Sequence, residues 1–135
     1  MVSARQGYER IEAGTQLDFR LQISSVAEGM FVALSIARIL GFNTELSTMK
    51  FAVRWTVLKG RVLTSWAEPG RFFRSFGSAA QNEFEYAINV PLNVAKADIH
   101  EYVGPVIDNF FAIFGGAEIS SSVVAEVVDA TLNRR

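Results

Sequence analysis

The stretch MKFAVRWTVLKGRVLTSWAEPGRFFRSF, residues 49–76, decides the fold predicted for this chain. Its first half alternates between two faces. One face is apolar, with Phe51, Val53, Trp55 and Val57, and the other carries Ala52, Arg54, Thr56 and Leu58. A period of two predicts a strand with one buried face. Lys59-Gly60 then predicts a tight reversal, so residues 61–66 are expected to return as the second strand of a hairpin.

Periodicity and capping signals predict the elements around this hairpin. Alternation predicts strands at 8–13, 17–23 and 83–90. Helical spacing predicts a helix at 26–40, opened by a Ser25–Glu28 capping box and ended by Gly41. A second helix should run from 94 or 98 to 114, kinked or divided at Gly104-Pro105, and a third from Ser120 or Ser121 to 132. The predicted order is β-β-α-β-β-β-α-α, an α+β fold with helices on one face of an antiparallel sheet of about five strands.

Length and composition predict one globular domain over residues 1–135, complete or excised from a larger protein. Half of the 135 residues are apolar and a fifth are charged, which is typical of a folded domain. The absence of cysteine excludes disulfides and zinc–thiolate sites. No apolar leader opens the chain, and the longest apolar segment, 30–40, is shorter than the ~20 residues of a membrane span. A cytoplasmic protein without a membrane partner is expected.

Charge is divided between two regions of the chain. Residues 50–76 contain six basic residues and one acidic residue, whereas residues 83–129 contain eight acidic residues and one lysine. The two regions either neutralise each other across the fold or form a dipolar surface that docks a partner. The net charge of −1 provides no overall attraction to nucleic acid or to an anionic membrane.

No combination of residues predicts catalysis, a metal site or a cofactor. His100 is the only histidine, and no nucleophile or second ligand is placed near it by spacing. Glu83 and Glu85 alternate on one strand face, which fits a solvated surface better than a pair of acids across a cleft. Gly115-Gly116 has no phosphate-binding frame around it and is explained by helix termination. We therefore expect a protein that is not an enzyme.

The basic residues near the hairpin suggest a binding surface, and the rings suggest either a core or a pocket. Phosphates could be met by five side chains: Arg54, Lys59, Arg61, Arg71 and Arg74. RNA-binding strands usually expose their aromatic residues, whereas alternation here places Trp55 on the same face as Val53 and Val57, which favours a core. A third interpretation is a small-ligand pocket between sheet and helices around Trp55, Tyr86 and Phe110.

One block of about twenty residues resembles a known family. The run Phe51-x-x-Arg54-Trp55-Thr56-x-Leu58-Lys59-Gly60-Arg61-x-Leu63-x-Ser65-Trp66-Ala67-x-Pro69, with IARILGF before it at 36–42, resembles the C-terminal region of bacterial proteins described as DNA-binding or ATP-binding. Those proteins carry a Schlafen/AlbA-type N-terminal domain, to which the family's nucleic-acid function is attributed. The resemblance implies a downstream accessory domain and transfers no active-site residue to this chain.

These observations leave three functions open. The first is a non-catalytic accessory domain of a larger bacterial regulatory protein, which mediates self-association or docks a protein partner. The second is a nucleic-acid-binding module that uses the basic hairpin. Nucleic acid could also be a partner of the larger parent protein. The third is a small-ligand sensor with an aromatic pocket.

Overall fold

The computed structural model describes residues 16–64, 78–116 and 119–133 and has an α+β fold. The strands are β1 (Gln16–Asp18), β2 (Thr48–Trp55), β3 (Val62–Thr64) and β4 (Phe84–Pro91). The helices are α1 (Phe19–Ile39), α2 (His100–Ala112) and α3 (Ser121–Leu132), and a short 3-10 helix, η2 (Lys96–Asp98), precedes α2. The strand predicted at 8–13 and residues 65–76 of the stretch 49–76 lie outside the described residues.

The central feature is a long antiparallel ribbon formed by β2 and β4. Thr48 pairs with Pro91 at one end and Trp55 with Phe84 at the other. Within β2 and β4 the predicted alternation is confirmed, because Val53, Trp55 and Val90 are buried while Lys50, Arg54 and Glu85 are exposed. The aromatic rings therefore face the helices, and the charged side chains face outward. Beyond Trp55 the predicted alternation is wrong, because Val57, predicted to face inward, is exposed and Leu58, predicted to face outward, is buried.

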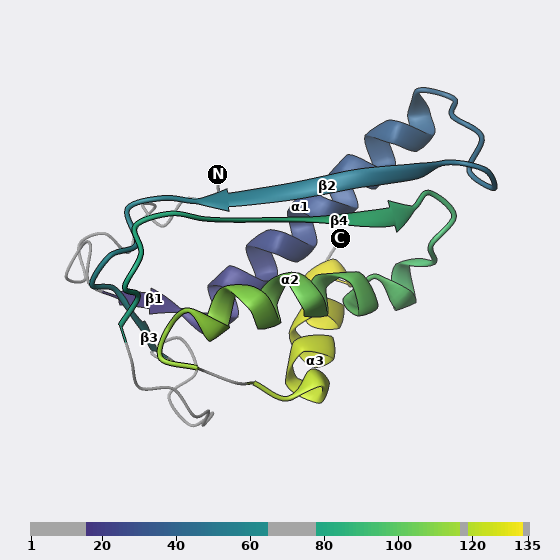
Figure 1. The fold of residues 1–135 in the computed structure, drawn as a ribbon. Coiled ribbons are helices and arrows are strands. Elements are labelled where there is room, and N and C mark those ends of the chain that lie inside the picture. The colour runs from purple at the N-terminus through teal and green to yellow at the C-terminus, as the bar shows by residue number, and fades with distance from the viewer. Residues whose placement is uncertain (1–15, 65–77, 117–118, 134–135) are drawn as a thin grey trace.

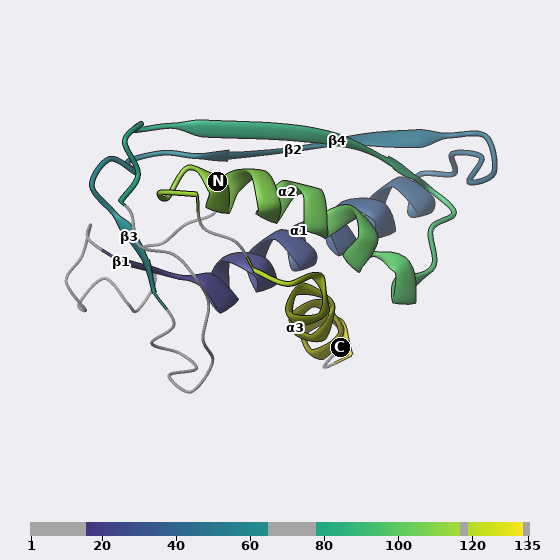
Figure 2. The same cartoon turned by 60° about the horizontal axis from the view of Figure 1, so that its bottom comes forward.

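All three helices lie on one side of this ribbon, as predicted (Figure 2). Helices α1 and α2 lie directly beneath the strands, and α3 packs beneath α1 and α2. Gly29 of α1 faces β2, and a Cβ at this position would make an ordinary van der Waals contact with the Phe51 ring at 3.5 Å. At the centre, the Trp55 indole stacks on Phe110 of α2, with ring centroids 3.8 Å apart and planes inclined by 9°.

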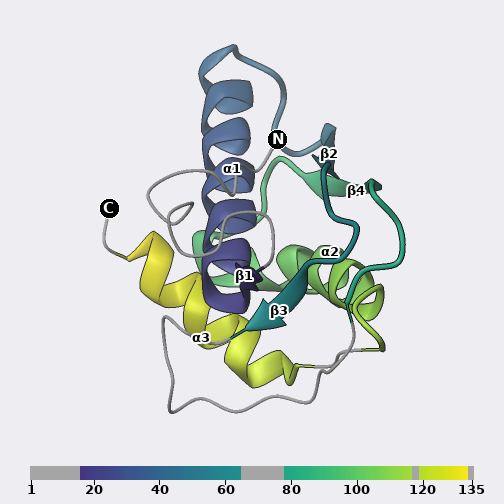
Figure 3. The same ribbon diagram turned by 90° about the vertical axis from the view of Figure 1, so that its left-hand side faces the viewer.

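The prediction of a five-stranded sheet is wrong. The described strands form two separate pairs, β2 with β4 and β1 with β3, and the second pair is parallel. It lies beside the N-terminal end of α1 (Figures 1 and 3). The helices therefore cover a two-stranded ribbon, and much of the core lies between the helices themselves.

The strand predicted at 17–23 is also wrong, because α1 begins at Phe19. Asp18 is its N-cap, and Oδ1 of Asp18 accepts hydrogen bonds from the backbone N–H groups of Arg20 (2.9 Å) and Leu21 (3.2 Å). A capped start satisfies N–H groups that have no partner within the helix. Ser25, the predicted cap, lies inside the helix, whereas the end of the helix at Leu40-Gly41 was predicted correctly.

The tight turn predicted at Lys59-Gly60 forms, because the Arg61 N–H donates to the Leu58 carbonyl across it at 2.9 Å, but the predicted hairpin does not. The chain around the turn continues alongside residues 79–82, and the backbone N–H groups of Leu58 and Gly60 donate to the carbonyls of Asn82 (3.0 Å) and Ala79 (2.9 Å). The strand paired with β2 is β4, and β3, after the turn, pairs with β1 instead. Val57, whose φ of +58° is left-handed, lies between the end of β2 and this turn.

The two later helices follow the prediction more closely. Pro105 lies inside α2, but the predicted division into two helices is not seen. Pro105 has no N–H to donate to the Glu101 carbonyl, so α2 gives up one intrahelical hydrogen bond there. Ser120 caps α3, accepting from the backbone N–H of Val123 at 3.3 Å, as predicted.

By length and composition alone, α1 could cross a membrane, which corrects the expectation that no apolar segment is long enough. A core helix passes the same test. The polar side chains of α1 are used within the domain: Gln22 accepts from Trp55, and the Ser24 hydroxyl lies 2.8 Å from that of Thr131 on α3. These contacts and its buried face are typical of a core helix.

Candidate interaction surface

The described members of the predicted basic site differ in their surroundings. Arg54 lies on the outer face of β2, where its guanidinium contacts the Glu83 carboxylate at 2.7 Å. The hydrogen bond and charge of Glu83 raise the pKa of Arg54. Lys59 is exposed beyond the end of β2, whereas Arg61 is half-buried and burial lowers its pKa. Arg71 and Arg74 lie outside the described residues.

Among the described residues, these positions indicate that the basic region 50–76 and the acidic region 83–129 neutralise each other. Arg54 faces Glu85 in the strand register and is bonded to Glu83, so a base of the first region meets two acids of the second. Among the described residues, Nε of Arg61 is buried without a hydrogen-bond partner, so this side chain is not freely presented to solvent.

The three residues of the predicted aromatic pocket lie between ribbon and helices, as expected, but the rings themselves occupy this space. Trp55 is 2% exposed and Phe110 is fully buried, and their stacking leaves no room for a ligand between them. Tyr86 is half-buried next to this core. The Trp55 indole N–H is satisfied by Gln22 rather than by a ligand.

A different surface, at the C-terminal end of α1, has the properties of an interaction site. Six large apolar side chains are exposed there, by 45% at Val32 and by up to 83% at Leu46. We call this the tip surface; it consists of Val32, Ile36, Ile39, Leu40, Phe42 and Leu46. It lies at the end of the ribbon where β2 begins (Figures 1 and 2). Contiguous exposed apolar area of this kind marks binding sites more often than chance.

Helical geometry explains why part of the tip surface forms a stripe. At 100° per residue, Val32, Ile36 and Ile39 lie within one narrow arc of α1. The buried residues Met30 and Leu34 lie on the opposite side, against the rest of the core. The C-terminal half of α1 therefore has an apolar face that the rest of the domain does not cover.

The sequence contained one signal for this surface. Apolar residues continue past the helix end, through Leu40 and Phe42 to Leu46, in a loop that should otherwise be polar. Periodicity could not identify the stripe, because α1 is apolar on most of its faces and the uncovered face cannot be distinguished.

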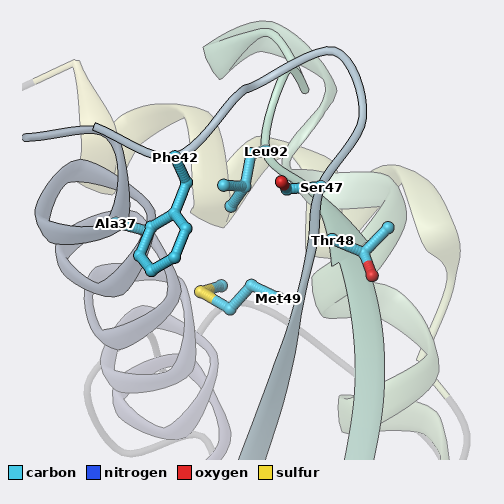
Figure 4. A pocket seen from close by; sticks show the side chains of 6 residues that line it. All are labelled: Ala37, Phe42, Ser47, Thr48, Met49 and Leu92. Atoms are coloured by element: carbon cyan, nitrogen blue, oxygen red, sulfur yellow. The ribbon is translucent and has the colours of Figure 1, made fainter. Parts of the chain in front are cut away.

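A pocket opens next to the tip surface, between α1, the loop after it and the start of β2. It has a volume of about 400 Å³ and is lined by Ala37, Phe42, Ser47, Thr48, Met49 and Leu92 (Figure 4). Phe42 belongs to both the pocket and the tip surface, so the two are continuous. The lining is mainly apolar, as is typical of sites that accept a hydrophobic group.

Arg38 fixes the segment after β4 that carries Leu92, one of the residues that line this pocket. Its Nε donates to the Leu92 carbonyl at 2.8 Å, and its Nη2 donates to the Val94 carbonyl at 2.7 Å. The Leu92 N–H in turn donates to the Ser47 carbonyl at 3.0 Å. These bonds tie the end of α1 to the turn after β4 and preorganise the pocket.

Comparisons with known proteins provide no identification of this chain. No family model, no curated protein and no solved structure matches it. The resemblance of residues 51–69 to proteins with a Schlafen/AlbA-type domain stays a prediction. In the part of the chain that the structure describes, no group of three or more His, Asp or Glu side chains could hold a metal ion.

Proposed function

We propose that this domain is a non-catalytic interaction module that self-associates through the tip surface. The observation that carries the proposal is the exposure of six large apolar side chains on neighbouring parts of α1 and its following loop. Exposed apolar residues scattered singly are normal on soluble proteins, whereas a continuous group at one end of a helix needs a partner.

The area of the tip surface suits a second copy of the chain. From the size of large apolar side chains, the exposed fractions leave an apolar area on the order of 600 Å². The tip surface therefore supplies most of the ~800 Å² that each partner buries in a stable interface, and flanking polar atoms would supply the rest, as in the rim of known interfaces.

Geometry and charge also favour self-association. Val32, Ile36 and Ile39 follow the i, i+4, i+7 spacing of a helix seam, and such a seam can pair with its own copy about a two-fold axis. The net charge of −1 provides little repulsion between copies. A nucleic-acid function has less support, because the rings face inward and Arg54 is already paired with Glu83.

Light scattering coupled to size-exclusion chromatography tests this proposal. The wild-type protein should show a dimer that dissociates on dilution, and a variant with Ile36→Glu and Ile39→Glu should be a folded monomer. Val57→Glu is the matched control. Like Ile36 and Ile39, Val57 is an exposed β-branched residue (61%), but it lies at the other end of β2. A strictly monomeric wild-type protein from micromolar to millimolar concentration would overturn the proposal.

Vesicle flotation distinguishes a second copy from a lipid surface. The proposal expects the wild-type protein to stay unbound to neutral phosphatidylcholine vesicles and to vesicles with added phosphatidylserine. Wild-type binding that Ile36→Glu abolishes, without any dimer in solution, would assign the tip surface to a membrane and overturn self-association.

A further inference from the structure

We infer that Leu46 of each copy inserts into the pocket of the other copy, which gives the dimer two reciprocal insertions. This inference rests on the proposed self-association and names the residue and the cavity that specify it. The inserted side chain is the most exposed large apolar side chain among the described residues, and the cavity is lined by Ala37, Phe42, Ser47, Thr48, Met49 and Leu92.

Leu46 is presented by a turn that is internally hydrogen-bonded. The Asn43 side-chain oxygen accepts from the Glu45 N–H at 2.9 Å, and the Asn43 carbonyl accepts from the Leu46 N–H at 3.2 Å. Gly41, at a φ of +89°, ends α1 and directs the chain into this turn. Because these bonds already order the backbone of the turn, burial of the exposed Leu46 by a partner costs only the rotamer freedom of its side chain.

The pocket is large enough for such a side chain and has a mainly apolar lining. A leucine side chain needs a volume on the order of 100 Å³, given that one water takes about 30 Å³, and the pocket offers about 400 Å³. Figure 4 shows the Phe42 ring and the Met49 side chain facing each other across the opening, with Leu92 behind them. These apolar groups would surround an entering methyl group, and Ser47 and Thr48 lie on the β2 side.

The short distance along the chain between the inserted residue and its pocket favours a two-fold arrangement. Leu46 directly precedes Ser47 of the pocket but does not fill its own pocket, as its exposure shows. A two-fold axis passing near Leu40 and Phe42 would let each Leu46 reach the opposite pocket, so both insertions form together. In a head-to-tail dimer, the pocket of one copy and the Leu46 of the other would stay unused, so the assembly would propagate.

Complementation between two variants tests this arrangement. Leu46→Glu removes the inserted group and leaves the pocket, and Ala37→Phe fills the pocket and leaves Leu46. Each variant alone should weaken dimerisation by roughly tenfold or more, as expected for a central anchor. An equal mixture of the two should form a heterodimer more readily than either variant forms a homodimer, because one insertion can still occur.

The outcomes separate this inference from the proposed function. If wild-type protein is a dimer and Ile36→Glu with Ile39→Glu disrupts it, but Leu46→Glu leaves its affinity unchanged, self-association stands and the insertion is overturned. A mixture without recovered dimer also overturns it, provided that circular dichroism shows both variants folded. A monomeric wild-type protein overturns both.

Cysteine crosslinking provides a direct geometric test, because the natural chain has no cysteine. A Leu46→Cys copy mixed with a Met49→Cys copy should form a mixed disulfide across the pocket under mild oxidation. A Leu46→Cys copy mixed with a Val57→Cys copy is the matched control and should crosslink at least about tenfold less. Equal yields in the two mixtures would overturn the inserted position of Leu46.

Discussion

The indole Nε1–H of Trp55 donates a hydrogen bond to Oε1 of Gln22, 3.1 Å away, inside the apolar core. The bond joins β2 to the first turns of α1 across 33 residues of chain. Trp55 and Gln22 are both 2% exposed, so neither group can turn to water instead. A hydrogen bond of this kind defines how the helix is placed against the strand.

We therefore expect Gln22→Leu to destabilise the fold by about 1–3 kcal/mol, because it leaves the Trp55 N–H buried without an acceptor. Trp55→Phe should also destabilise the fold, since it leaves Gln22 without its donor. The double variant should lose less than the sum of the two single losses. Urea unfolding followed by far-UV circular dichroism measures all three, and strict additivity would contradict the importance of this bond.

Arg38 provides a second prediction, because its guanidinium bonds to two carbonyls at once. Arg38→Met should destabilise the fold by about 1–3 kcal/mol, the range for hydrogen bonds that involve a charged group. Arg38→Lys keeps the charge but cannot reproduce the planar fork, so it should recover only part of the loss. Full recovery by lysine in thermal unfolding would show that charge alone matters.

Substitution of Val57 should raise the stability of the fold. A β-branched residue in the left-handed region is strained by about 1–2 kcal/mol, and Val57 is mainly exposed, so little burial offsets this strain. Asparagine tolerates the conformation, and Val57→Asn should raise stability by about 1 kcal/mol. Val57→Thr keeps the branched Cβ and should change nothing. Melting temperatures of the three proteins test this, and equal values would argue against a left-handed residue here.

Asp108 should lower the stability of the fold as the pH rises, whereas a carboxylate in an ion pair raises it. Asp108 is exposed on α2, but neighbouring protein atoms partly desolvate its carboxyl and raise its pKa above the ordinary 3.8. The folded state then holds this proton more tightly than the unfolded state does, so stability falls as pH rises from about 3.8 through the folded pKa. Asp108→Asn should have a slightly higher melting temperature than wild type at pH 7, and the difference should vanish near pH 3. A constant difference at both pH values would contradict this.

How far the fold could be predicted depended on whether local and distant contacts agreed. The alternation of Phe51, Val53 and Trp55 identified the inward face of β2 correctly, since side chains alternate in any strand whatever its partner. Leu17, Phe19, Leu21 and Ile23 fit the same period, yet Phe19 and Ile23 also continue the helical stripe of Met30 and Leu34. Asp18 capped the longer helix, and the packing against α2 and α3 decided between the two patterns.

The candidate site was less predictable than the fold. The basic residues were visible as a charge pattern, but their pairing with the acids at 83–85 needed the register of β2 against β4. The tip surface was missed because exposure of Ile36 or Ile39 depends on where the other helices lie, and no local pattern reports that.

From the sequence alone came the α+β class, the inward direction of the rings, the C-terminal end of α1 and the ends of α3, because each depends on backbone geometry and on neighbours within one or two turns. Only the tertiary structure decided which strand pairs with which, and which face of α1 is left bare. Those outcomes depend on contacts between residues far apart in the chain, whose energies are similar for several competing arrangements until the whole core is packed.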